Sequence, residues 1–301
     1  EGFRRDTAVS LLPRDWPTGP NPARARVGQV RVLPGDWDLS EESAAVDSFF
    51  PTAITAQPGL TLLGWSVPDV VWRAGDTAQV DLLWQSEHVT SRAAPIALVL
   101  TDAAGAEAAR LPIAPGGMDD GVDGWPETAV VRDQIGWRLP PQLETGVYAI
   151  TLQAGDQNVP LGSWQIDAPP HDFTPPPVGA TAVLTTPFAS LAGYNWGETA
   201  VAPGATVELE LVWQALATAD ASYRVFVHLV DADGQIVAQS DAVPDNWTRP
   251  TTGWLPGEFI RDRHALVVPE TAVPGPYRLR VGWYDTVTGQ RLGEIEAPLG
   301  P

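Results

Sequence analysis

Histidine, the residue most used for metal ligation and for general acid–base catalysis, is rare in this chain. Its four copies are His88, His171, His228 and His264, and no two of them have the spacing of a metal site. Cys is absent, which excludes thiolate ligands and a Cys nucleophile. The sequence also lacks a nucleophile-elbow Ser motif and a Gly-rich phosphate loop. We therefore expect no enzyme active site, and packing or surface roles for the histidines in preference to metal binding.

Acidic residues gather most densely in one Gly-rich loop, residues 118–124. Its carboxylates Asp119, Asp120 and Asp123 could supply oxygen ligands to Ca²⁺. The spacing is not that of an EF-hand, and no Glu closes the loop at the right distance. A solvated turn is the favoured interpretation and Ca²⁺ at these three residues is the alternative. No other cofactor is expected.

Trp is the residue type in clearest excess, and an exposed Trp can stack on a sugar ring. Trp247 lies in a long polar loop, beside Asn246 and close to Arg249. A sugar stacked on Trp247 would leave its hydroxyls within reach of the Asn246 amide and the Arg249 guanidinium. These three residues are the best ligand-contact candidates, and the alternative is that Trp247 folds back onto the protein.

An internal duplication in the sequence shows which strands and loops carry these residues. One constant spacing, without insertion or deletion, relates residues 62–148 to residues 191–277, and we expect the segments 62–167 and 191–298 to superpose. Chance agreement that includes two Trp pairs is very improbable, so the segments are repeats of one unit. The matched residues include Trp84 and Trp213, Trp125 and Trp254, Arg132-Asp133 and Arg261-Asp262, and Tyr148 and Tyr277.

Each repeat alternates apolar and polar residues with the period of two that is typical of half-buried strands. Trp84 and Trp213 end such strands on the apolar side and are expected in the core. Trp125 and Trp254 lie in turns, where we expect them to pack beneath a loop. Tyr148 and Tyr277 each follow a Gly shortly before a strand, which resembles the tyrosine corner of immunoglobulin-like sandwiches.

The pairs Arg132-Asp133 and Arg261-Asp262 could be read as active-site groups. Neighbours on a strand point to opposite faces, so the two members of a pair cannot contact each other. Because the pair recurs in each repeat, we interpret it as part of the scaffold.

A third and weaker copy opens the chain. Arg5-Asp6 matches Arg261-Asp262, and Val27-Gly28 matches Leu292-Gly293. The fold class expected is all-β, with tandem immunoglobulin/fibronectin III-like β-sandwiches. The expected organisation is a partial tail of a preceding repeat at 1–33, a linker at 34–60, a module at 61–167, a Pro-rich linker at 168–188 and a module at 189–298. Exposed strand edges seek partners, so we expect 1–33 to pair with 34–60, with its own chain or with another molecule.

The net charge of −19 narrows the choice of partners. A surface this acidic repels nucleic acid and anionic lipid, so neither is expected. No apolar run reaches the ~18 residues of a membrane-spanning helix. The chain begins at Glu1 without a signal peptide, which we interpret as a mature or excised fragment of a longer protein.

Several short motifs occur together in the last repeat. They are Leu191-Ala-Gly-Tyr194, Val212-Trp-Gln-Ala215, Phe226-Val-His-Leu229, Asp231-Ala-Asp-Gly234 and Trp254-Leu-Pro-Gly-Glu258. Together they resemble one family of bacterial modules, the immunoglobulin-like domains in the extracytoplasmic C-terminal tails of membrane glycosyltransferase-like proteins. The resemblance covers 188–298 well, 60–167 less and 1–33 least. It implies a bacterial extracellular or cell-surface location and carries over no catalytic residue.

Two functions follow as expectations. The first is a non-catalytic structural or interaction array, a spacer or assembly element whose partners are other protein modules or copies of itself, joined by strand pairing. The second is a set of carbohydrate-binding modules that serve a glycan-handling cell-surface protein, with Trp247 as the contact.

Overall fold

The structure, a computed structural model, describes residues 26–33, 54–57, 59–86, 95–115, 130–197 and 201–298. Its regular elements are strands, apart from the short 3-10 helix η2 (Thr251–Gly253), which confirms the predicted all-β fold. The chain divides into two compact units between Ala168 and Pro169. No helix long and apolar enough to cross a membrane occurs in the described part of the chain.

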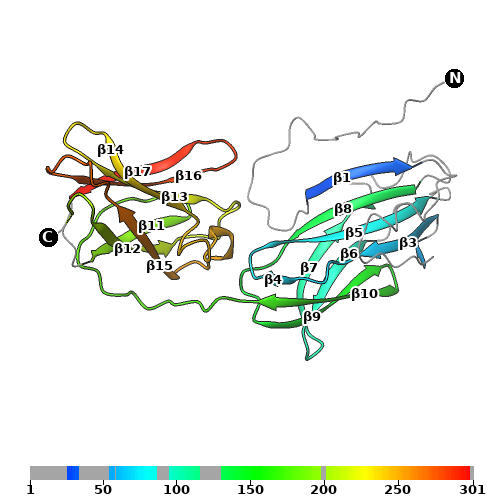
Figure 1. Ribbon diagram of the computed structural model, residues 1–301. Coiled ribbons are helices and arrows are strands. Elements are labelled where there is room, and N and C mark those ends of the chain that lie inside the picture. Colours follow the sequence, from blue (N-terminus) through cyan, green and yellow to red (C-terminus); the bar gives the residue numbers. More distant parts are fainter. Residues whose placement is uncertain are drawn as a thin grey trace, which may run out of the picture. The chain divides into compact units, whose positions relative to one another are not determined.

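The first unit is a sandwich of two five-stranded sheets (Figure 1). One sheet has the order β1-β8-β5-β3-β2 and the other the order β4-β10-β9-β6-β7. Both bury apolar side chains in a common core, which includes Trp84 and Trp164. The bounds are β1 (Arg26–Leu33), β2 (Ile54–Gln57), β3 (Leu60–Ser66), β4 (Val71–Arg73), β5 (Thr77–Ser86), β6 (Ile96–Thr101), β7 (Glu107–Ile113), β8 (Val130–Arg138), β9 (Gly146–Ala154) and β10 (Gln157–Asp167).

The second unit pairs a three-stranded sheet, β11-β12-β15, with a four-stranded sheet, β14-β13-β16-β17. The two sheets face each other across one core (Figure 1). The bounds are β11 (Ala189–Trp196), β12 (Thr206–Ala215), β13 (Arg224–Val230), β14 (Ile236–Ala242), β15 (Phe259–Val267), β16 (Arg278–Tyr284) and β17 (Arg291–Pro298).

Alternation along β12 shows why these segments form strands. Val207, Leu209 and Leu211 are buried, whereas Glu208 between them is exposed. Each fully buried side chain of this size stabilises the fold by about 1.5–3 kcal/mol. Three Trp rings close the core, with the centroid of Trp283 4.7 Å from that of Trp213 and 5.8 Å from that of Trp254.

The duplicated sequence is matched by duplicated topology. The order β3-β5-β8 in the first unit corresponds to β11-β12-β15 in the second, and β7-β6-β9-β10 corresponds to β14-β13-β16-β17. The register agrees as well, since Trp84 lies opposite Val131 and its counterpart Trp213 lies opposite Ile260. The first unit adds β1, β2 and β4 to this shared frame.

Both expected linkers contribute to the folded units. β2 falls in the segment 34–60, where it pairs with β3 and adds a strand to the first sandwich. The segment 168–188 belongs to the second unit, where Leu184 and Phe188 are buried in the core and Ala180 forms a bridge with Tyr194. The Pro content of this segment suggested a spacer, but its apolar side chains still pack. The second module therefore begins before residue 189, which corrects the predicted boundary.

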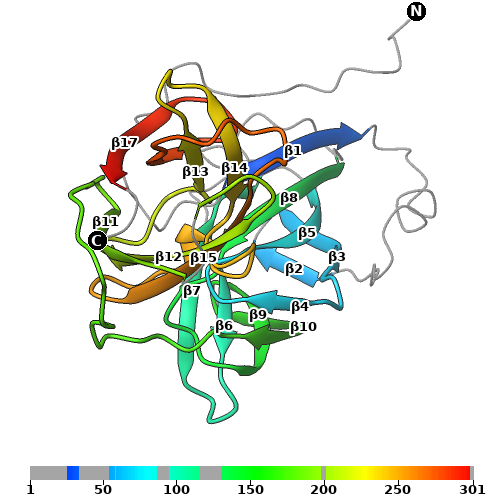
Figure 2. The same ribbon diagram turned by 60° about the vertical axis from the view of Figure 1, so that its left-hand side comes forward.

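β1 belongs to the segment 1–33 and pairs with the same chain. It runs antiparallel to β8, from Arg26 opposite Gly136 to Leu33 opposite Val130, and lies beside β8 in both views (Figures 1 and 2). This is the own-chain alternative of the three that were expected for residues 1–33. Residues 1–25 lie outside the described residues.

Tyr148 and Tyr277 have the geometry of tyrosine corners. Both are 7% exposed. The Tyr277 hydroxyl donates to the carbonyl of Val273 at 2.7 Å, and the Tyr148 hydroxyl donates to the carbonyl of Glu144 at 2.9 Å. Each bond fixes the loop that precedes a central strand to the start of that strand.

Replacing Tyr277 by Phe tests this role. Tyr277→Phe leaves the Val273 carbonyl without its donor, so we expect the free energy of unfolding to fall by about 1–2 kcal/mol. Thermal and urea melts measure the change. Tyr284→Phe, at a partly exposed position at the far end of the same strand, is the control and should melt close to wild type. Equal melting of Tyr277→Phe and wild type would contradict the tyrosine corner.

Candidate functional site

Each unit buries one carboxylate beneath a core Trp. Trp84 Nε1 donates to Asp133 Oδ2 at 3.0 Å, and Trp213 Nε1 donates to Asp262 Oδ2 at 3.1 Å. Asp262 is fully buried, so its charge has to be balanced by donors inside the protein. The Asp of each Arg-Asp pair is therefore a structural group that ties the central strand to its neighbour.

The Arg of each pair points away from that core and contacts another strand. Arg132 bonds to Asp81 Oδ2 at 2.8 Å, and Arg261 lies 3.6 Å from Glu210 Oε1. Both are cross-strand ion pairs on the outer face of their sheet.

In the second unit the buried carboxylate lies beside His264, which in turn contacts Ser240. His264 Nε2 lies 3.0 Å from Asp262 Oδ2, at ion-pair distance but outside hydrogen-bond geometry. The other ring nitrogen, Nδ1, lies 2.9 Å from Ser240 Oγ. Ser, His and Asp in this order are the groups of a hydrolase triad. His264 is buried between β14 and β15, however, and its Nε2 makes no hydrogen bond to Asp262, so we interpret the three groups as a link between the two sheets.

Asp262 also fixes a strained turn at the surface. Its Oδ1 accepts the backbone N–H of Asp245 at 2.9 Å. Asp245, Asn246 and Trp247 have φ values of 50°, 51° and 72°, the left-handed region that side chains other than Gly disfavour by roughly 1–2 kcal/mol each. Such strain persists only where surrounding contacts enforce it, and it clusters at functional sites.

This turn presents Trp247 to solvent, with 51% of the residue exposed. This exposure favours the ligand-contact interpretation of Trp247 over the alternative that it folds back onto the protein. The Arg224 guanidinium lies 4.6 Å from the centroid of the indole ring and covers one of its faces. Asn246 is exposed beside it. The indole is thus supported from one side and exposed elsewhere, which is the arrangement of a stacking platform.

Arg249 does not belong to this platform, which corrects its assignment as a ligand contact. Its guanidinium forms an ion pair with Glu258, whose side chain is fully buried, and donates to the carbonyl of Pro170 at 3.1 Å. The carbonyl of Arg249 accepts from Trp254 Nε1 at 3.0 Å, and Trp254 is fully buried. These bonds hold the loop from within. Sequence spacing placed Arg249 near Trp247 but could not show which way its side chain points.

The remaining candidates cannot be placed. Asp119, Asp120, Asp123 and Trp125 lie outside the described residues. No cluster of three or more potential metal ligands occurs among the residues that the structure describes.

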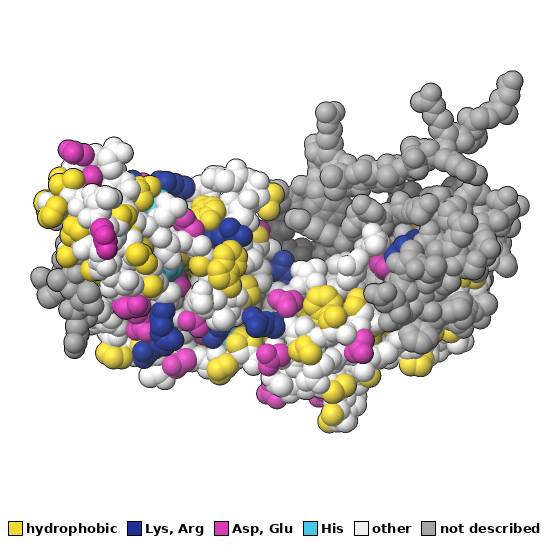
Figure 3. Space-filling model, viewed as in Figure 1, with side chains coloured by type: hydrophobic (Ala, Val, Ile, Leu, Met, Phe, Trp, Pro, Cys, Tyr) yellow, Lys and Arg dark blue, Asp and Glu magenta, His cyan; other side chains and the backbone are white. Residues whose placement is uncertain are grey.

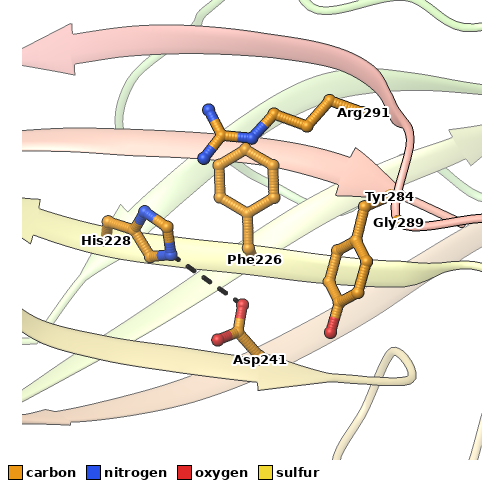
Figure 4. A pocket seen from close by; sticks show the side chains of 6 residues that line it. All are labelled: Phe226, His228, Asp241, Tyr284, Gly289 and Arg291. Carbon is orange, nitrogen blue, oxygen red and sulfur yellow. Dashed lines mark ion pairs between the residues drawn. The ribbon is translucent and has the colours of Figure 1, made fainter. Parts of the chain in front are cut away.

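A hollow of about 210 Å³ lies on the outer face of the four-stranded sheet (Figure 4). Phe226 and His228 form its floor, with their rings 4.8 Å apart. The Arg291 guanidinium lies 4.7 Å from the Phe226 ring centroid, and Asp241 Oδ1 is 3.9 Å from His228 Nε2. Tyr284 and Gly289 complete the lining.

Gly282 gives the floor its shape. It lies opposite Phe226 in the register of β13 and β16. A Cβ at this position would come within 2.3 Å of the Phe226 ring, so only Gly lets the ring lie flat across β16. Phe226 was not predicted as a site residue, although the alternation of β13 places an aromatic ring and a His on the face away from the core.

The distribution of surface charge does not indicate a class of ligand. Arg and acidic side chains are interspersed over the face seen in Figure 3, and no single-sign patch stands out. Within the hollow, burial lowers the pKa of His228 below its ordinary value of 6.5, although the nearby Asp241 acts in the opposite direction. His228 is therefore neutral at pH 7 and has one donor and one acceptor nitrogen.

No known protein family matches the chain, and no curated protein matches it. A mutant of Salmonella alpha-2-macroglobulin is 14% identical over 88% of this chain and 16% of its own, with a TM-score of 0.26. A glycosyl hydrolase family 2 member from Bacteroides cellulosilyticus is 12% identical over 73% of this chain and 28% of its own, with a TM-score of 0.25.

A DUF4785 family protein from Legionella pneumophila is 9% identical, over 80% of this chain and 57% of its own, with a TM-score of 0.23. This chain spans only a minor part of the first structures that it matches. At these identities and TM-scores the likenesses assign no function.

Replacing the buried carboxylate tests the link from core to turn. In Asp262→Asn one carboxylate oxygen is replaced by an NH₂ group. That group would face one of the two donors, Trp213 Nε1–H or the Asp245 N–H, which would then lose its acceptor. We expect Asp262→Asn to lower the free energy of unfolding by about 1.5–3 kcal/mol and to speed hydrogen exchange at the Asp245 amide. Asp133→Asn is the matched control, which should weaken the first unit and leave the Trp247 turn unchanged. Slow Asp245 exchange in a folded Asp262→Asn variant would contradict the link.

Proposed function

We propose that the chain is a non-catalytic structural and interaction array of immunoglobulin-like sandwiches, and that strand pairing joins the segment 1–33, the end of one repeat, to the repeat that follows it. The observation that carries this proposal is the antiparallel pairing of β1 with β8. The segment 1–33 matches the end of the other repeats in sequence, so this pairing is a joint between one repeat and the next. Strand addition of this kind supplies main-chain hydrogen bonds along a whole edge.

The hydrogen-bond pattern shows which groups form the joint. The N–H of Leu139 bonds to the carbonyl of Asp76 at 2.8 Å, so odd-numbered residues of β8 face β5. The even-numbered residues, among them Gln134, direct their backbone groups toward β1. In β15 the N–H of Val268 bonds to the carbonyl of Ala205 at 2.9 Å, so the outward residues there are odd-numbered, among them Arg263. No described strand pairs with that edge of β15.

The family resemblance supports a location for this array. Immunoglobulin-like modules of this type occur in the extracytoplasmic tails of bacterial membrane glycosyltransferase-like proteins. A spacer at the cell surface, with other modules or further copies of itself as partners, agrees with the all-β architecture and with the acidic composition. Detection of the parent protein by surface labelling of intact cells tests this part of the proposal.

Proline substitution tests the joint. Gln134→Pro removes an N–H that faces β1, so we expect the amides of residues 26–33 to exchange at least about tenfold faster. Arg263→Pro is the matched control at the equivalent outward position of β15, and it should leave exchange in 26–33 unchanged. Hydrogen exchange read by mass spectrometry measures both. Unaltered protection of 26–33 in Gln134→Pro would overturn the strand joint.

A second function, carbohydrate binding, is favoured by one specific observation. The exposed Trp247 is held out by a strained turn, and the equivalent position in the other repeat is Met118, so the shared fold does not require an aromatic there. A sugar would stack on the indole face opposite Arg224, with Asn246 beside it. One such contact gives about millimolar affinity, and repetition along an array would raise it.

Titration with oligosaccharides tests this second function. The probes are neutral hexaoses of glucose, xylose and mannose, followed by Trp fluorescence and calorimetry. Trp247→Ala should weaken binding roughly fivefold, the equivalent of about 1 kcal/mol of stacking, whereas Trp247→Phe should retain most of it. Equal binding by wild type and Trp247→Ala, or the absence of binding in both, would remove the carbohydrate proposal and leave the array.

A further inference from the structure

The hollow beside His228 shares a face with the Trp247 platform. In β13 the side chains of Val225, Val227 and Leu229 enter the core, so Arg224, Phe226 and His228 project from the opposite face. Arg224 stacks on Trp247, and Tyr284 lies opposite Arg224 in the register with β16. Arg224 and His228 are four residue steps apart along the strand, a span of about 13 Å. The two features are therefore the ends of one strip.

We propose that this strip binds a single neutral glycan chain, stacked on Trp247 at one end and hydrogen-bonded to His228 Nδ1 in the hollow at the other. This inference rests on the carbohydrate-binding function proposed above and extends it to a second contact. It makes the ligand an oligosaccharide rather than one sugar ring.

His228 supplies the observation that points to a ligand. It is only 7% exposed, and its Nδ1 is buried without a hydrogen-bond partner in the structure. Nδ1 lies on the ring edge away from Asp241, which faces Nε2 (Figure 4). Buried polar atoms in native proteins are nearly always paired, so an unpaired nitrogen on a side chain that lines a hollow is a candidate partner for a ligand group.

The lining selects the class of ligand. Asp241 accepts hydrogen bonds, Arg291 donates them, and neutral His228 and Tyr284 do both. A polyhydroxylated ligand matches this mixture, because every hydroxyl both donates and accepts. A phosphate would only accept and would be repelled by Asp241, and an apolar ligand would leave His228 unpaired.

The other repeat shows that the shared fold does not require these residues. Ala97 lies opposite Gln153 in the first unit, in the register that Phe226 and Gly282 occupy in the second. The positions of His228 and Asp241 correspond in the same way to Val99 and Pro112. Two sandwiches with one topology therefore differ where the hollow is, so the scaffold alone does not account for it.

The charge state of His228 gives the site a pH dependence with a defined sign. The charged groups that face it are Asp241 on β14, Arg280 on β16, and Arg291 and Glu294 on β17. Burial is the largest influence and lowers the pKa of His228 below 6.5, so the imidazole is neutral above that pH and protonates as the pH falls below it. Protonation removes the acceptor nitrogen. Glycan binding should be constant above about pH 7 and weaken on acidification.

The test compares two substitutions at one position, in the full chain. His228→Phe keeps the ring and removes both nitrogens, whereas His228→Asn keeps a polar atom close to the place of Nδ1. With the neutral hexaose that binds wild type best, we expect His228→Phe to weaken binding by about tenfold and His228→Asn by much less. Wild-type affinity should fall as the pH is lowered from about 7 through the depressed pKa of His228, and affinity of the Asn variant should not. Near-UV circular dichroism and melting confirm that both variants fold.

Each outcome separates this inference from the function on which it rests. If hexaose binding depends on Trp247 but is equal in wild type and His228→Phe, the second contact is overturned and the carbohydrate function is kept. Binding of the monosaccharide as tight as that of the hexaose also overturns it, because one ring cannot span the strip. No binding of any hexaose by wild type overturns both. Tighter binding of inorganic phosphate or of an oligogalacturonate than of neutral hexaoses overturns the assigned ligand class.

Discussion

The buried carboxylate of Asp262 is the constraint on which the second unit depends. A charge removed from water is tolerated only where donors surround it, and Asp262 receives the Trp213 indole N–H from the core and the Asp245 amide from the surface loop. Asp133 receives the same indole bond from Trp84 in the first unit. This Trp–Asp hydrogen bond thus belongs to the shared scaffold. The second unit adds a bond from the same carboxylate to a turn at the surface.

That connection explains how a strained turn persists. Three successive left-handed residues would relax if the turn were free, because each is disfavoured in that region. The N–H of Asp245 is held by Asp262, and the N–H of Trp247 bonds to the carbonyl of Val243 at 2.9 Å. Packing of the core therefore positions an aromatic ring in solvent, and the free energy that holds the turn comes from contacts that the sandwich needs in any case.

Sequence alone predicted the features that depend on local period and on repetition. Alternation of period two gave the strands, and the constant spacing of the repeats placed Trp84 and Trp213 in equivalent strands; the all-β fold is confirmed. Features set by cross-strand neighbours were missed. Arg249 lies near Trp247 in sequence but forms its ion pair with Glu258. His228 became a candidate contact only because Phe226 and Asp241 line the same hollow. Register and side-chain direction decide such contacts, and neither is visible in a linear spacing.

Comparison of the two units distinguishes the residues that both sandwiches share from those that only one of them has. Groups that recur in both, such as the Trp–Asp bond and the corner tyrosines, secure the sandwich itself. Several groups present in only one unit lie at its periphery: β1 occupies an edge of the first, whereas Trp247 and the hollow occupy the loop and outer face of the second. A core that fixes topology through few residues leaves edges and outer faces free to differ. One duplicated frame can then join repeats at one copy and hold a ligand at the other.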